Sequence, residues 1–95
     1  MASSYAVELR IQGLVQEVFF RHSAKQMADR LGITGWARNE PDTSVSIFAQ
    51  GEKDALQKLI DWCKKGTEWS RVNDVKVEWK DATEKPTTFE ILSIG

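Results

Sequence analysis

Hydrophobic and polar residues alternate over the first part of the chain. Within the segment Ser4–Gln12, a large apolar residue stands at every second position from Tyr5 to Ile11. A period of two residues is typical of a strand with one buried face. We therefore predict a strand over this segment, with Gly13 ending it.

The period then lengthens to that of a helix. From Phe20 to Leu31, apolar residues recur three or four positions apart, and Gly32 suits a helix C-terminus. The same spacing returns over Glu52–Lys65, which Gly66 follows. We predict two amphipathic helices that pack one face each on a common core.

The rest of the chain alternates again and predicts four more strands. A turn is expected at residues 40–43, where Pro41 and Asp42 are typical turn formers. The predicted strands are Ile33–Asn39, Val45–Gly51, Val75–Lys80 and Phe89–Ile94. The order β-α-β-β-α-β with one terminal strand predicts an α+β, ferredoxin-like split β-α-β sandwich, with two helices on one face of an antiparallel sheet. With 95 residues and no linker or repeat, residues 1–95 are expected to form a single domain.

Composition narrows the classes of partner. The net charge is −1, from 13 basic and 14 acidic side chains that are interspersed, so neither nucleic acid nor a membrane is an expected partner. Cys63 and His22 are the only residues of their types, which excludes an internal disulfide and leaves too few ligands for structural zinc. A carboxylate-bound magnesium ion stays open, although no acidic cluster stands out. Residues 1–7 do not resemble a secretion signal and a single cysteine suits a reducing compartment, so we expect a cytoplasmic protein. Nothing in the sequence requires more than a monomer, and we expect no cofactor.

The segment between the first strand and the first helix is the one that points to chemistry. A loop that enters a helix presents unpaired N–H groups beside the positive end of the helix dipole, which favours an anion. Arg21 lies at this end, where its charge opposes the dipole unless an anion is bound. The alternative is that Arg21 is a surface residue paired with Glu17 or another carboxylate. The neighbouring His22 is expected to flank the site rather than act as a base.

Several motifs together resemble the acylphosphatase family. They are Gly13-Leu14-Val15-Gln16, Val18-Phe19-Phe20-Arg21, Leu31-Gly32-Ile33-Thr34-Gly35-Trp36 and Arg38-Asn39. The similarity spans nearly the whole chain at matching spacing, and its joint pattern is specific although each piece alone is weak.

The resemblance implies hydrolysis of the carboxyl-phosphate bond of small acyl phosphates. It implies that Arg21 binds the phosphate and that Asn39 orients the attacking water. It also implies a cradle of backbone N–H groups, contributed by Val15, Gln16, Glu17, Val18, Phe19 and Phe20. Such a reaction needs mainly positioning and charge stabilisation, so neither a metal nor a nucleophilic triad is required.

The chain departs from the family pattern at three positions. Glu17 replaces a glycine in the middle of the cradle. If the glycine is needed for positive φ, Glu17 strains the loop. Separately, its carboxylate either repels the substrate or pairs with Arg21 and competes for it. The milder alternative is that Glu17 keeps φ negative with its side chain in water. Phe19 is a variant that we expect to be tolerated. Thr43 replaces a turn glycine and suggests an altered turn.

Two other functions remain as alternatives. Glu17 in the cradle leaves open a catalytically weakened module that binds an anion without turnover. RNA binding on the open sheet is less well supported, because the central strands lack an RNA-recognition motif and the net charge is negative. The sequence does not identify the physiological acyl group.

Overall fold

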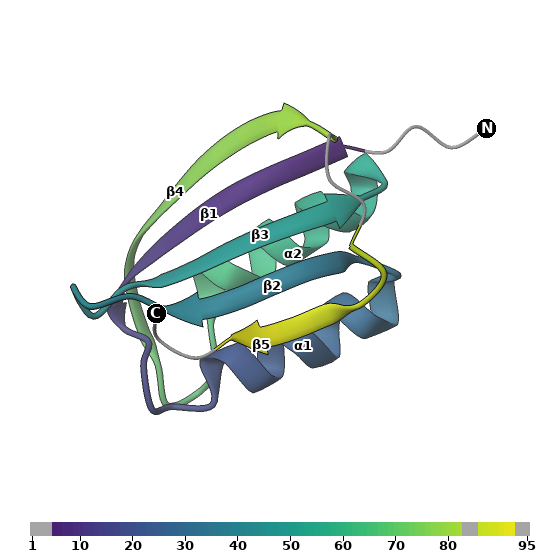
Figure 1. Cartoon of the computed structure of the whole chain (residues 1–95). Coiled ribbons are helices and arrows are strands. Elements are labelled where there is room, and N and C mark those ends of the chain that lie inside the picture. Colours follow the sequence, from purple (N-terminus) through teal and green to yellow (C-terminus); the bar gives the residue numbers. More distant parts are fainter. Residues whose placement is uncertain (1–4, 83–85, 93–95) are drawn as a thin grey trace.

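The computed structural model describes residues 5–82 and 86–92 and forms two layers, a sheet and a pair of helices (Figure 1). The sequence predicted this α+β sandwich, and the structure confirms it. The elements are β1 (Tyr5–Leu14), α1 (Phe20–Leu31), β2 (Thr34–Asn39), β3 (Val45–Gly51), α2 (Lys53–Lys65), β4 (Arg71–Asp81) and β5 (Phe89–Leu92). Neither helix is long and apolar enough to cross a bilayer within the described residues.

The strand order in the sheet is β4-β1-β3-β2-β5. The first four strands are antiparallel to their neighbours, as the split β-α-β pattern requires. β5 pairs in parallel with β2, so the sheet is mixed rather than wholly antiparallel as predicted. β5 is the edge strand beside β2. Alternation within a strand does not determine whether it runs parallel or antiparallel to its neighbour, so the sequence pattern did not predict this direction.

Both helices cover the same face of the sheet, and the core lies between the two layers (Figure 1). Alternate residues of β1 point into this core, and Val7, Leu9 and Ile11 are at most 2% exposed. They meet the apolar stripes of the helices, whose fully buried members include Ala24 and Leu59. Burying such side chains stabilises the fold by about 1.5–3 kcal/mol each for the larger ones.

Four strand boundaries differ from the predicted ones: the end of β1, the start of β2 and both ends of β4. β2 begins at Thr34 rather than Ile33, and β4 ends at Asp81 rather than Lys80. β1 does not end at Gly13 but continues to Leu14, because a register shift between Gln12 and Gly13 lets the strand stay paired with β4. β4 begins at Arg71, before the alternation that starts at Val75. The predicted ends at residues 4 and 93–94 lie outside the described residues.

The β2–β3 turn is built around an aspartate. Asp42 Oδ1 accepts hydrogen bonds from the Ser44 N–H at 3.0 Å and from the Ser44 hydroxyl, which confirms Asp42 as a turn former. Thr43 takes φ 75°, the left-handed region that glycine favours. The backbone at Thr43 therefore has the conformation that glycine favours, although the residue is β-branched.

Replacing Thr43 by glycine is expected to stabilise the protein. A β-branched residue is strained at positive φ, and we expect Thr43→Gly to raise the free energy of unfolding by about 0.5–1 kcal/mol. Chemical denaturation monitored by tryptophan fluorescence measures the change. Thr43→Ala is the control, because alanine removes the side chain but remains disfavoured at this φ. An equal gain from Thr43→Ala would show that the backbone conformation is not the cause.

Candidate active site

The loop between β1 and α1 begins at a close backbone contact. Gly13 has φ 132°, and a Cβ at this position would lie 2.0 Å from the Arg71 carbonyl oxygen, so only glycine fits. The chain thus passes next to β4 and turns into residues 15–19, which form no regular element. The register shift that sequence reasoning missed is what directs the loop toward α1.

The amides of this loop have no acceptor in the part of the chain that the structure describes. Among the described residues, no backbone N–H from Val15 to Phe20 donates a hydrogen bond to a backbone or side-chain oxygen. At the N-cap of α1, Phe19 provides no side-chain cap, and the first turn holds no acidic residue. Unpaired amides at a helix N-terminus form an electropositive concavity that suits an anion.

Two loop residues adopt conformations that favour glycine. Glu17 and Phe19 both have φ 60°. Of the two alternatives left open for the backbone of Glu17, the structure has the strained, positive φ, and Phe19 is not a neutral variant with respect to the backbone. Each such residue costs about 1 kcal/mol or more, and it persists because the flanking elements fix both ends of the loop.

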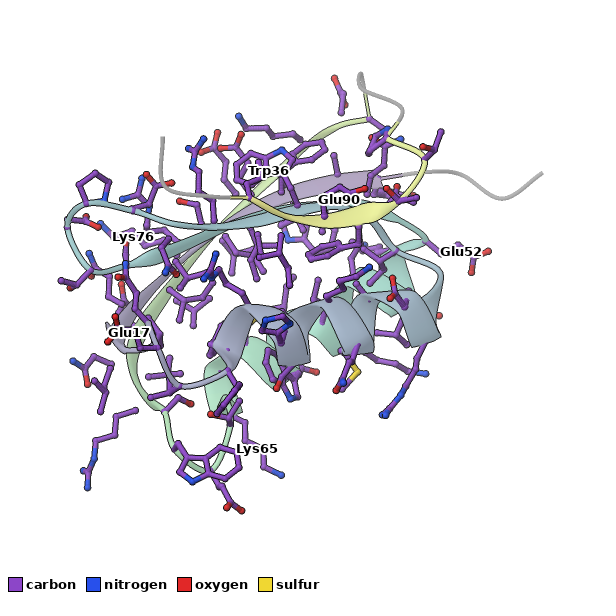
Figure 2. All side chains as sticks on the ribbon, turned by 60° about the horizontal axis from the view of Figure 1, so that its bottom comes forward. Glu17, Trp36, Glu52, Lys65, Lys76 and Glu90 are labelled. Atoms are coloured by element: carbon purple, nitrogen blue, oxygen red, sulfur yellow. The ribbon has the colours of Figure 1, made fainter. Side chains whose placement is uncertain are left out.

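The Glu17 side chain is exposed, and it forms no ion pair with Arg21 or with any other described residue. Figure 2 shows it at the end of the molecule where the loop leads into α1. Direct pairing of Glu17 with Arg21, which would make Glu17 compete with a bound anion, is not found among the described residues. Its charge nonetheless lies beside the cradle.

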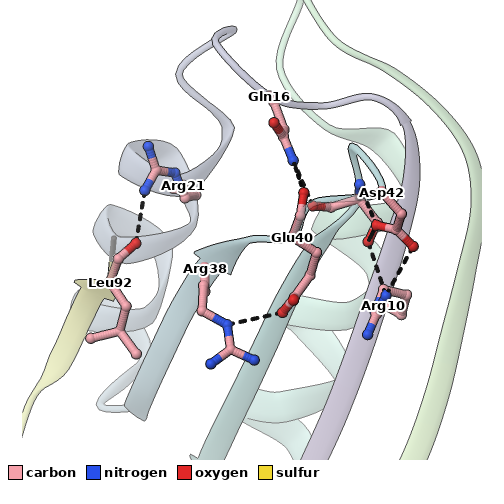
Figure 3. Close-up of polar contacts among 8 residues, drawn as sticks. Arg10, Gln16, Arg21, Arg38, Glu40, Asp42 and Leu92 are labelled. Carbon is pink, nitrogen blue, oxygen red and sulfur yellow. Dashed lines mark hydrogen bonds and ion pairs between the residues drawn. The ribbon is translucent and has the colours of Figure 1, made fainter. Parts of the chain in front are cut away.

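Side chains fix the loop to two neighbouring turns. Gln16 Nε2 donates to the carbonyl oxygens of Glu40 at 2.8 Å and Ser44 at 2.9 Å, which joins the loop to the β2–β3 turn (Figure 3). Thr67 Oγ1 donates to the Val18 carbonyl at 3.1 Å from the α2–β4 connection. Sequence reasoning assigned Gln16 only a backbone role. Its side-chain role was missed because nothing in the sequence shows that residues 16 and 40 meet.

Arg21 lies in the first turn of α1 and reaches β5. Its Nη1 donates to the Leu92 carbonyl oxygen at 3.0 Å (Figure 3). Within residues 5–82 and 86–92 it has no carboxylate partner, so the surface ion pair considered for it is not found there. Lys25, one turn later, likewise donates to the Phe89 carbonyl at 2.8 Å. Both cations thus hold β5 on α1, while the charge of Arg21 remains available to an anion.

Asn39 ends β2 on the face that the helices cover. It is 7% exposed, and its Oδ1 is buried without a hydrogen-bond partner among the described residues. A buried, unpaired oxygen costs about 1–3 kcal/mol and is uncommon, so it points to a ligand or water. Asn39 directly precedes Glu40, which receives the Gln16 bond, and follows Arg38, which pairs with Leu92. These contacts bring the loop, Arg21 and Asn39 to one end of the sheet.

A cleft of about 190 Å³ opens at the loop. Its lining residues are Val15, Glu17, Phe19, Phe20, Arg21 and His22. It therefore brings together Arg21 and four of the six predicted cradle residues, whereas Asn39 does not line it. His22 lines this cleft with an exposed side chain, in keeping with a flanking position.

Charged groups stiffen the turn that follows Asn39. The pKa of Glu40 lies below its usual range. The main cause is a hydrogen bond from Ser46, and the hydrogen bond and charge of Arg38 add to it, while burial acts in the opposite direction. Arg38 Nε lies 2.9 Å from Glu40 Oε2, and its guanidinium stacks 4.9 Å from the centroid of the Trp36 ring. Trp36 lies on the side of the sheet away from the helices (Figure 2). The open sheet face thus anchors the turn against which the loop packs.

Comparisons with known proteins agree on one family. A family model described as acylphosphatase matches residues 7–91. The acylphosphatase of Rubrobacter xylanophilus is 41% identical over 85 residues, which cover 90% of this chain and 77% of that protein. The crystal structure of acylphosphatase from Bacillus subtilis superposes with a TM-score of 0.90 at 32% identity, covering 93% of this chain and 98% of that one. An acylphosphatase from Coxiella burnetii gives a TM-score of 0.89 at 30% identity, covering 95% and 94%.

The Glu40 carboxylate is expected to make stability depend on pH. Because its pKa is lowered in the folded state, its contribution is present above the pKa of the unfolded chain and is lost as pH falls through the folded pKa. We expect Glu40→Gln to cost up to about 1 kcal/mol at pH 7, with the difference from wild type shrinking below about pH 4. Urea unfolding across this pH range measures it.

Glu68→Gln is the matched control, because Glu68 is exposed and has no hydrogen-bond or ion-pair partner in the described part of the chain. A Glu40→Gln difference that stays constant or grows toward acid pH would contradict the assignment of the stabilising contact to the ionised carboxylate.

Proposed function

Since the chain belongs to the acylphosphatase family and is an acylphosphatase that hydrolyses acyl phosphates, we propose that the loop before α1, Arg21 and Asn39 carry out this reaction. The observation that carries the proposal is the row of unpaired amides from Val15 to Phe20 beside a guanidinium that has no carboxylate partner among the described residues.

The phosphate group is bound by the loop amides. Successive N–H groups surround an anion more closely than flexible side chains can, and the dipole of α1 adds a favourable field. The uncapped N-terminus of α1 supports this role, since a bound phosphate would satisfy the donors that no side chain caps. Phosphate binding also offsets the unfavourable position of the Arg21 charge.

The Arg21 guanidinium adds a charged group that binds the phosphate oxygens. One of its N–H groups is already held by the Leu92 carbonyl, which limits the orientations of the guanidinium plane. The remaining N–H groups donate to phosphate oxygens in the forked geometry that guanidinium favours. Charge that spreads over these oxygens in the transition state is stabilised by donors already in place.

Asn39 positions the attacking water. Its buried Oδ1 needs a donor, and a water molecule supplies one while aiming its lone pair at phosphorus. An amide is a poor base, so a phosphate oxygen accepts the proton of the water. The water oxygen bonds to phosphorus, the bond to the acyl oxygen breaks, and the carboxylate leaves with the electron pair. The products are a carboxylate and inorganic phosphate.

Glu17 favours a second candidate, an anion-binding module with weak turnover. Its carboxylate lines the same cleft as Arg21 and opposes an incoming dianion. Because the side chain is exposed and unpaired, water and salt screen most of this repulsion, which favours a slowed enzyme over an inert one.

Removing either proposed side chain is expected to lower activity in a different way. Arg21→Ala loses a charged donor and should reduce kcat/KM for benzoyl phosphate about 10²–10³-fold. Asn39→Ala leaves the cradle intact and should reduce kcat about 10²-fold with little change in inhibition by inorganic phosphate. Steady-state hydrolysis, with inorganic phosphate as the competitive inhibitor, measures both.

Lys25→Met is the matched control for Arg21. It removes the neighbouring tether between α1 and β5 without touching the cradle, so it should lower stability and leave kcat/KM within about twofold. If Lys25→Met lost as much activity as Arg21→Ala, Arg21 would be a structural tether of β5 and its proposed role would be wrong.

Two substitutions separate the strain at Glu17 from its charge. Glu17→Gln removes the charge alone and should raise kcat/KM severalfold at low ionic strength, with the gain fading as salt is added. Glu17→Gly also relieves the positive φ and should add about 0.5–1 kcal/mol to the free energy of unfolding. Unchanged kinetics in both variants would exclude Glu17 as an inhibitory element.

A further inference from the structure

Two large aromatic side chains are exposed side by side next to the candidate active site. Phe19 is 65% exposed and Trp69 is 60% exposed. Their ring centroids lie 6.0 Å apart at an interplanar angle of 64°, an edge-to-face contact. Isolated exposed aromatics are unremarkable, but a pair at the rim of a binding cleft is typical of a surface that contacts an apolar ligand.

The two rings come from separate segments that the fold joins. Phe19 belongs to the cradle loop, and Trp69 belongs to the turn between α2 and β4. Thr67 Oγ1 bonds to the Val18 carbonyl and fixes these segments to each other, while Ser70 Oγ accepts from the Thr67 N–H at 2.8 Å and braces the turn. The aromatic pair therefore has a defined position relative to the loop amides.

Phe19 is the ring that faces the cleft. It lines the 190 Å³ space together with Arg21, whereas Trp69 lines a neighbouring hollow with residues of α1 and α2. Trp69 therefore contacts the Phe19 ring without lining the cleft itself. Phe19 is the N-cap of α1 and has a left-handed φ, so its side chain does not follow the direction that residues inside the helix adopt.

We propose that the Phe19 ring, supported by Trp69, is the subsite for the acyl group and makes the enzyme prefer aromatic or extended apolar acyl phosphates. This inference rests on the proposed phosphate position at the loop amides and Arg21. With the phosphate there, the acyl group extends out of the cradle. Phe19 is the exposed apolar residue that lines the cleft, since Val15 and Phe20 are buried. An acetyl or carbamoyl group is too short to cover it.

The contact acts on binding more than on the chemical step. The acyl group keeps its place against Phe19 while the phosphorus–oxygen bond breaks, so the ground state and the transition state gain alike. The preference should therefore appear mainly in KM. Stacking of a benzoyl group on one partly exposed ring is expected to favour benzoyl over acetyl phosphate by about tenfold beyond the intrinsic difference of the substrates.

The test is the ratio of kcat/KM for benzoyl phosphate to that for acetyl phosphate. Phe19→Ala and Phe19→Gly both remove the ring, and the glycine variant also relieves the backbone, so agreement between them excludes a loop artefact. We expect the ratio to fall about tenfold in both and severalfold in Trp69→Ala, with the loss in KM for benzoyl phosphate. Trp79→Ala is the matched control, because Trp79 is a 41% exposed ring that does not line the cleft.

Each result decides a different claim. A ratio unchanged in the Phe19 variants, or a fall in Trp79→Ala as large as theirs, overturns the acyl subsite and leaves the catalytic proposal standing. Should the Phe19 variants fail to fold, the ratio in Trp69→Ala decides the question alone. If the wild-type protein hydrolyses neither substrate above the spontaneous rate, the proposed function fails and the subsite fails with it.

Discussion

The side-chain amide of Gln16 holds the two halves of the site together. Its bonds to the carbonyl oxygens of Glu40 and Ser44 join the loop before α1 to the turn after β2. The donors of the proposed cradle belong to the loop, and Asn39 belongs to β2, immediately before that turn. Because a misplacement of about 1 Å can cost 10²-fold in rate, this link matters more to the reaction than its small contribution to stability.

Most of the fold follows from local pattern. Alternation in β1 and β3 and helical spacing in α1 and α2 predict these elements because each places an apolar face in a shared core; the other face of the central strand β3 is buried as well. The parallel pairing of β5 with β2 was missed, since strand direction depends on which sheet edge the chain reaches. The early start of β4 was also missed. Residues 71–74 pair with the bulged end of β1, a contact that alternation within β4 does not encode.

The sequence identified the candidate residues of the site but did not predict the backbone conformation of its loop. Motif resemblance singled out Arg21 and Asn39 as candidates, and the fold brings both to one end of the sheet. The positive φ of Glu17 and Phe19 could not be predicted from the residue types, because both types favour negative φ. It follows from closing a short loop between the close contact at Gly13 and the first turn of α1. The hydrogen bonds of the Gln16 and Thr67 side chains also depend on how this loop closes, because they join it to residues far away in the sequence.

Strain in this loop has a physical explanation that also bears on function. A relaxed loop would let its amides find carbonyl partners, and the unpaired donors would be lost. Here both ends of the loop are fixed by regular elements, and its middle is fixed by bonds from Gln16 and Thr67, so Glu17 and Phe19 remain left-handed although neither is glycine. The amides from Val15 to Phe20 consequently have no acceptor in the described part of the chain. If the loop binds phosphate as proposed, it needs little reorganisation to do so, because the fold, rather than the substrate, supplies the energy that holds the loop in this conformation.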